Sequence, residues 1–118
     1  MADDRRDLLQ GTLELLVLKT LSLEPMHGWG IARRIELLSR DVFLVTQGSL
    51  YPALQRMKRR GWVKSAWRPS EHHRRARWYE LTVHGRRQLD LERSAWTRAS
   101  SAVNGILDAR IVPGLGDA

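Results

Sequence analysis

The hydrophobic residues of this chain recur at helical spacing in four segments, and short aromatic-rich runs separate the third segment from the fourth. The first segment, residues 8–23, is too long for an ordinary strand and predicts a helix. Leu9, Leu13 and Leu16 form one stripe on it, and further leucines lie around its sides. A helix that is apolar nearly all round is buried on two sides. Because a domain of this size has little depth, we expect a second subunit to cover one of those sides.

Two shorter helical segments follow. A turn over residues 24–28 contains a proline and a glycine, which end the first helix. Residues 29–39 then carry an apolar stripe at Ile31, Ile35 and Leu38. Short helices joined by a short turn are typical of a helix-turn-helix.

The third segment, residues 46–60, has one apolar and one polar face. The apolar face consists of Leu50, Leu54 and Met57. The polar face beside it consists of Gln47, Tyr51, Gln55 and Lys58. Within a continuous helix the ring of Pro52 would crowd the carbonyl of Gly48, so the helix either begins near Pro52 or bends there. The sequence leaves both alternatives open.

After Gly61, a residue type that commonly ends helices, the pattern becomes that of strands. Residues 62–67 and 77–81 are rich in aromatic and β-branched side chains and predict a β-hairpin. The polar residues 68–76 between them are expected to form a basic loop that projects into solvent. The default expectation for the tryptophans of the hairpin is packing in the core or across the strands. These tryptophans are Trp62, Trp67 and Trp78.

The last helix is predicted over residues 83–109, with Thr82 as its N-cap. Its apolar positions alternate in spacings of three and four, interrupted by Glu92. This narrow seam is the pattern of a helix that packs lengthwise on another helix. We therefore expect a dimerisation seam, which consists of Leu89, Trp96, Ala99, Val103 and Ile106.

Together these elements predict a mainly α fold with a small β-hairpin, in the order of a winged helix-turn-helix followed by a long C-terminal helix. The expected division has three parts. Residues 1–81 form the winged helix-turn-helix DNA-binding domain, residues 82–110 form the C-terminal dimerisation helix, and residues 111–118 form a flexible tail.

Charge changes this picture because it is localised. The 118 residues carry a net charge of +7. Residues 56–87 hold eleven of the 20 basic residues and two of the 13 acidic ones, a net charge of +9, so nine basic and eleven acidic residues elsewhere leave −2. Such a patch indicates an anionic partner. A helix fits the major groove of DNA. The β-hairpin with its basic loop, residues 62–81, would be the wing and can lay arginines along the adjacent phosphates.

The expected DNA contacts follow from these two elements. Phosphate contacts supply most of the affinity, and side chains on the third helix read bases. The candidates on the helix are Gln47, Ser49, Tyr51, Gln55, Lys58 and Arg59, and those on the wing are Arg74, Arg75 and Arg77. For Tyr51, packing under the start of the helix is the alternative to a contact with DNA. The alternative function is a winged-helix protein-interaction module without sequence-specific DNA binding.

Several classes of site and location are not expected. The chain has no cysteine, which excludes disulfides, thiolate zinc sites and cysteine nucleophiles. His72 and His73 are adjacent, so on an extended segment they point opposite ways, and His27 and His84 lack a carboxylate or thiol at ligand spacing. Ser49 lies outside a nucleophile-elbow pattern, and a phosphate-binding loop is missing. We expect no metal, cofactor or enzymatic activity.

Neither a secretory signal nor an apolar run of the ~20 residues that span a bilayer is visible. The expected protein is therefore soluble and cytoplasmic, without a membrane partner.

Three groups of residues carry a family resemblance. They are Pro25, Gly28, Trp29 and Ile31; the run Gly-Ser-Leu-Tyr-Pro-Ala-Leu from Gly48 to Leu54; and Arg77, Tyr79, Leu81, Thr82, Gly85 and Arg86. Over about residues 8–105 the chain thus resembles the PadR family of bacterial transcriptional regulators. The resemblance implies that the third helix and the wing bind an inverted-repeat operator, usually in a repressor, and that the C-terminal helix dimerises. It also implies that some members release DNA on binding a phenolic acid or a planar drug.

The chain departs from the family pattern in two places. Trp29 and Gly30 stand where tyrosine and a polar residue are common, which leaves the DNA-binding interpretation intact. The single C-terminal helix resembles the shorter branch of the family and leaves no room for an elaborate effector domain. Trp96 therefore has two interpretations: packing within the seam, or, paired with its symmetry mate, flanking a pocket for a flat aromatic effector.

Overall fold

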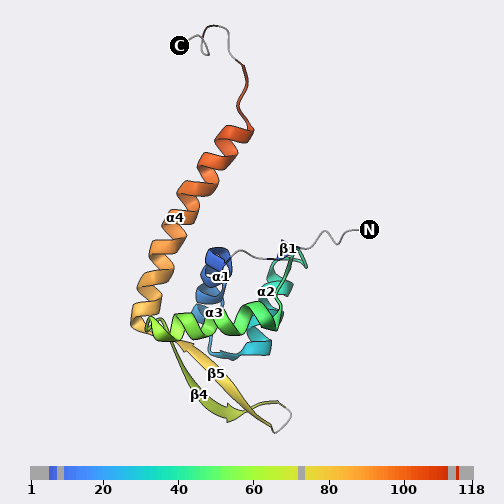
Figure 1. Cartoon of the computed structure of the whole chain (residues 1–118), viewed down its shortest axis with the longest axis vertical. Coiled ribbons are helices and arrows are strands. Elements are labelled where there is room, and N and C mark those ends of the chain that lie inside the picture. Colours follow the sequence, from blue (N-terminus) through green and yellow to red (C-terminus); the bar gives the residue numbers. More distant parts are fainter. Residues whose placement is uncertain (1–5, 8–9, 72–73, 112–113, 115–118) are drawn as a thin grey trace.

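The structure, a computed structural model, describes residues 6–7, 10–71, 74–111 and 114. Its helices are α1 (Gln10–Leu23), α2 (Gly28–Leu38), α3 (Gln47–Arg59) and α4 (Val83–Leu107). Its strands are β1 (Arg6–Asp7), β2 (Met26–His27), β3 (Phe43–Leu44), β4 (Val63–Pro69) and β5 (Arg75–Leu81). Helices α1, α2 and α3 pack together, the β4–β5 hairpin extends from one side, and α4 projects away on the other (Figure 1). The expected winged helix-turn-helix with a long C-terminal helix is confirmed.

The core forms where the helical stripes meet. The α3 residues Leu50, Leu54 and Met57 are all fully buried, as their spacing predicts. Helix α1 contacts α2, α3, α4 and β5, so its own chain covers more of it than we expected from the sequence. Its buried apolar side chains are Leu13, Val17, Leu18 and Leu21. Leu8 and Leu9 lie outside the described residues.

The starts of α3 and α4 are set by side-chain caps. Helix α3 begins at Gln47, where the Thr46 hydroxyl accepts a hydrogen bond from the backbone of Ser49, and it continues through Pro52. The helix therefore starts before the proline, which rules out a start near Pro52. The predicted cap of α4 is confirmed, since Thr82 Oγ1 accepts a hydrogen bond from the backbone of Gly85 at 2.9 Å.

The wing is larger than a hairpin. Strand β2 pairs antiparallel with β5, which gives a three-stranded sheet in the order β2-β5-β4. From the sequence alone, residues 24–28 are expected only to form a turn, because a two-residue strand is too short to show alternation. The expected loop over residues 68–76 is also too long, since β4 and β5 remain paired out to Pro69 and Arg75. Backbone pairing continues there because it does not require apolar side chains.

One further expectation was wrong. Leu38 is 64% exposed rather than part of the core, because α2 ends at this residue and its buried stripe stops at Ile35. Of the two positions expected for Trp67, the structure shows packing across the strands, since this residue is 54% exposed and lies directly opposite Arg77 in the sheet. The short parallel pairing of β1 with β3 was not predicted. In the described part of the chain, none of the helices combines the length and the apolar character needed to cross a membrane.

Candidate nucleic-acid interface

Helix α3 separates its buried and exposed faces completely. Leu50, Ala53, Leu54 and Met57 are fully buried. The predicted contact residues Gln47, Ser49, Gln55, Lys58 and Arg59 are all exposed on the same helix. Because one face holds α3 to the core, the other can present polar side chains without unpacking the fold.

The first turn of α3 is held by two hydroxyl groups. Thr46 Oγ1 accepts the backbone N–H of Ser49 at 3.2 Å and donates to Ser49 Oγ at 3.1 Å. The Ser49 hydroxyl thus accepts a hydrogen bond within the cap, and its own proton remains available to an outside acceptor.

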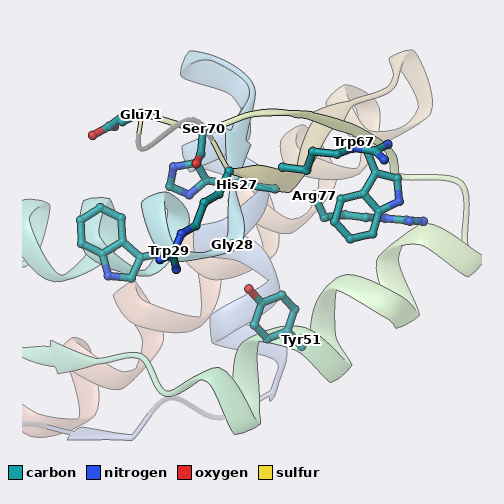
Figure 2. A pocket seen from close by; sticks show the side chains of 11 residues that line it. His27, Gly28, Trp29, Tyr51, Trp67, Ser70, Glu71 and Arg77 are labelled. Carbon is teal, nitrogen blue, oxygen red and sulfur yellow. The ribbon is translucent and has the colours of Figure 1, made fainter.

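Tyr51 combines packing with exposure. Its ring lies against Gly28 at the start of α2, and a Cβ at position 28 would lie 2.6 Å from the Tyr51 hydroxyl (Figure 2). The side chain still remains 37% exposed. Glycine at position 28 therefore permits the close approach of α2 and α3, and the hydroxyl stays within reach of a ligand.

The α3-facing side of the wing carries an aromatic and two cations. Trp67, Arg75 and Arg77 share one face, since Trp67 is paired with Arg77 and residues two apart on a strand point the same way. The guanidinium carbons of Arg77 and Arg75 lie 5.3 and 5.6 Å from the Trp67 ring centre. Arg77 Nε also donates to Ser65 Oγ at 3.1 Å. These contacts orient both arginines. Arg74 is exposed at the end of the loop.

Part of the basic patch serves the fold itself. Glu14 on α1 has a side chain only 5% exposed, and its carboxylate accepts Arg56 Nε at 3.0 Å and Arg60 Nη1 at 3.4 Å. Lys64 pairs with Glu80 across the hairpin at 3.0 Å. This link between α1 and α3 was not predicted from the sequence, because 42 residues separate Glu14 from Arg56 and no local pattern joins them.

The predicted seam on α4 divides into two parts. Leu89 belongs to the core of its own chain, with 8% exposure. Farther along, Ala99 is exposed, Trp96 and Val103 are about half exposed, and Ile106 is 74% exposed. Leu89 therefore packs in the core of the winged helix-turn-helix, and the other seam residues lie on the surface of α4, which projects from it (Figure 1).

A groove of about 260 Å³ lies beside Trp96, between α4 and the start of α1, and Glu92 lines it. Glu92 Oε1 accepts from Gln88 Nε2 at 3.3 Å, while Oε2 is buried without a hydrogen-bond partner among the described residues. Burial raises the pKa of Glu92, and nearby Glu14 raises it further, whereas Gln88 and Arg60 lower it. Burial likewise raises the pKa of Tyr79 on β5, with Tyr51 adding to the rise and Arg77 opposing it.

Metal ligands do not gather in the part of the chain that the structure describes: no group of three His, Asp or Glu side chains there could hold an ion. His72 and His73 lie outside the described residues.

Comparison with known proteins identifies the family. The Transcriptional regulator PadR-like family matches residues 17–91. The chain belongs to the PadR family. Members of this family are DNA-binding regulators of transcription. The family match covers most of the winged helix-turn-helix and the first part of α4.

Solved structures agree with this assignment. A PadR-like transcriptional regulator from Bacillus cereus is 26% identical, with 86% of this chain and 97% of that one covered and a TM-score of 0.74. A PadR family regulator from Clostridium difficile is also 26% identical, covering 80% and 97% with a TM-score of 0.68. A protein from Streptococcus mutans, 23% identical, shares the fold at a TM-score of 0.78 over 91% and 96%. The comparison with curated proteins gave no match.

Proposed function

We propose that this PadR-family protein is a homodimeric, sequence-specific repressor that binds an inverted-repeat operator, with α3 in the major groove and the wing on the phosphate backbone. The observation that carries the proposal is the two-faced α3: four residues fully buried, and a polar face exposed beside a wing that presents arginines. A helix of this kind can approach base edges while its packing stays intact.

The proposed contacts divide by chemistry. Gln47 and Gln55 carry amides that can pair with adenine edges, each good bidentate contact contributing about 1–3 kcal/mol to discrimination. Ser49 and Tyr51 offer hydroxyl donors to a base or a phosphate. Cationic side chains bind the phosphates. The cationic side chains proposed for this role are Lys58, Arg59, Arg74, Arg75 and Arg77.

The projecting part of α4 supports the homodimer. Its large apolar side chains remain exposed on a single chain, and they include Leu91, Trp96, Val103, Ile106 and Leu107. Exposed apolar stripes on a helix favour packing against another helix. A two-fold axis through α4 would repeat α3 on the other subunit, and recognition helices about 34 Å apart read half-sites one turn of DNA apart.

Selection of bound duplexes from a random pool tests sequence-specific recognition. We expect enrichment of an inverted repeat with half-site centres about one helical turn apart. A pool that stays random after repeated rounds would contradict the proposal and favour the protein-interaction module. Repression is tested by placing the selected site before a reporter gene, since a repressor lowers expression and an activator raises it.

The wing is tested by the salt dependence of binding. Replacing Arg74 and Arg75 together by alanine should weaken binding to all sequences and lower the salt slope by about 1.8, because each phosphate contact contributes about 0.9. Arg110→Ala is the matched control, because this exposed arginine follows α4 at the end far from the wing (Figure 1). An unchanged slope in the wing variant would remove these arginines from the interface.

Light scattering after size exclusion tests the dimer. At micromolar concentration the wild-type chain should elute with twice the protomer mass, and Val103→Asp with Ile106→Asp should shift it to the protomer mass, since two charges would enter the apolar contact. A wild-type monomer at that concentration would refute the homodimer.

We also propose that the groove beside Trp96 admits a small aromatic effector that releases DNA. The half-exposed indole and the apolar positions around it support this role. Flat aromatic compounds should quench the protein fluorescence and lower operator binding, and Trp96→Ala should abolish both effects. Release of DNA that persists unchanged in Trp96→Ala would contradict the role of this groove.

A further inference from the structure

A second cavity, larger than the groove beside Trp96, lies where the wing, the start of α2 and Tyr51 of α3 converge (Figure 2). Its volume is about 610 Å³. Cavities of about 300–1,000 Å³ are typical of small-molecule sites. The cavity is therefore large enough for a ligand much bigger than a single phosphate ion.

Two tryptophans from different elements border the cavity. Trp29 of α2 is 58% exposed and Trp67 of β4 is 54% exposed, and they stand at opposite ends of the cavity in Figure 2. Indole rings of this exposure present flat apolar area to solvent. Aromatic ligands stack on such surfaces in offset or edge-on arrangements. The shape and apolar character of these indole surfaces suit a flat aromatic ring.

Cations stand beside one of these rings. Arg75 and Arg77 line the cavity, and their contacts with Trp67 and Ser65 hold the guanidinium groups near its wall. A guanidinium binds a phosphate through two parallel hydrogen bonds, a geometry that suits an anion with several oxygens. Among the described lining residues Glu71 is the one acidic side chain, so the cationic character prevails.

His27 adds a donor of defined orientation. As the N-cap of α2, its Nδ1 accepts the backbone N–H of Gly30 at 3.0 Å. The neutral imidazole must therefore carry its proton on Nε2. The Trp78 ring packs edge-on against the imidazole at 5.1 Å and restricts its rotation. The N-terminal end of α2, which carries partial positive charge, opens on the same cavity.

We propose that this cavity binds small aromatic phosphate monoesters, that is, molecules with a flat aromatic ring and a compact phosphate anion, in competition with DNA. The ring stacks on an indole, and the phosphate accepts hydrogen bonds from Arg75, Arg77 and His27 Nε2–H. Nucleotides and aryl phosphates share this chemistry. The competition rests on the proposed function, because a DNA strand running between α3 and the wing would occupy the same space.

Isothermal titration of the DNA-free protein tests the site directly. The probes are 2-naphthyl phosphate and adenosine monophosphate, which represent the two sources of the ligand. Inorganic phosphate and 2-naphthol are the matched halves of the first probe. At least one of these two aromatic phosphate monoesters should bind, and each half alone should bind at least tenfold more weakly, because the ring and the anion contact different walls.

Variants assign the binding to the cavity. Trp67→Ala should weaken the bound aryl phosphate about tenfold, the usual consequence of losing one stacking partner. Trp29→Ala tests the other end of the cavity. Because Trp29 lies on α2, this variant separates the loss of a ligand contact from a folding defect in the wing. Arg77→Ala should weaken the aryl phosphate but leave 2-naphthol unchanged, whereas Arg110→Ala should alter neither. Operator duplex and the probe should displace each other. In a gel-shift titration, the probe should therefore lower the fraction of duplex that the protein retards.

Several results would overturn the proposal. They are absence of binding by both aromatic phosphate monoesters, equal binding of inorganic phosphate alone, and a probe that stays bound when DNA is added. Binding that survives in Trp67→Ala and Trp29→Ala but is lost in Trp96→Ala would place the ligand in the α4 groove instead. In the first two cases operator binding can remain normal, so the proposed repressor function would stand while this site fails.

Discussion

Gly85, in the first turn of α4, lies against the backbone at the base of the wing. A Cβ at this position would lie 2.8 Å from Leu81 Cδ1 and 3.0 Å from the carbonyl carbon of Trp62, and it would overlap the Trp62 carbonyl oxygen. That oxygen is held in place, because it accepts hydrogen bonds from Thr82 N at 3.0 Å and from Thr82 Oγ1 at 3.1 Å. Gly85→Ala must therefore push α4 away from the wing.

The magnitude follows from two opposing effects. Overlap with a fixed backbone costs about 3 kcal/mol, the upper part of the range for overpacked sites. Alanine in place of glycine stabilises the helix by about 1 kcal/mol through its better helix propensity. The net loss in the free energy of unfolding is thus about 2 kcal/mol, or roughly 8 °C in Tm for a domain of this length.

Urea denaturation followed by far-ultraviolet circular dichroism measures this loss. Gly105→Ala is the matched control, because Gly105 lies in the same helix with nothing within 4 Å of its added Cβ, and it should gain about 1 kcal/mol. All variants are compared at one protomer concentration, since dimerisation would make stability concentration-dependent. If Gly85→Ala is as stable as Gly105→Ala, the close approach at Trp62 does not exist in solution.

Two carboxylates give further predictions. Because the pKa of Glu92 is raised in the folded state, its carboxyl group holds a proton there that the unfolded chain has lost, so its contribution to stability falls as pH rises from its ordinary pKa through the raised one. Glu92→Gln should remove this fall in urea denaturation at pH 4.5 and 7, and an unchanged pH dependence would assign it to other groups. Glu14→Gln should cost about 2 kcal/mol in the same assay, because it leaves Arg56 without its buried partner. Glu24→Gln, which breaks an exposed pair with Arg34, should cost less than about 0.5 kcal/mol, and equal losses would show that burial of Glu14 is irrelevant.

The sequence was most informative where an element displays its own period. In α3 the spacing of Leu50, Leu54 and Met57 covers two turns, and all three residues are buried. The cap at Thr82 could likewise be predicted, because a cap depends on side-chain chemistry within three residues. The pattern failed at Leu38, since the same spacing continues into the last turn of α2 after the core has ended.

Features that join distant segments could not be predicted in this way. Strand β2 consists of two residues whose extended conformation depends on β5, about fifty positions later. The cavity has the same origin, because Trp29 and Trp67 come to line one cavity only through that pairing and the packing of Tyr51 on Gly28. One local signal was available: alternation from buried Val63 places Ser65 and Trp67 on the same side of β4, which turns Trp67 toward α3.

The pairing of Met26 with Tyr79 and of His27 with Trp78 has a consequence for exchanging parts between regulators. A wing is often regarded as a separable attachment whose replacement changes only its own contacts. Here the central strand of the sheet, β5, is bonded on one side to β4 and on the other to the segment that leads into α2. A wing grafted from another protein would have to reproduce the register opposite Met26, or its arginines would be rotated relative to α3. A functional chimera should therefore carry residues 24–30 together with residues 62–81.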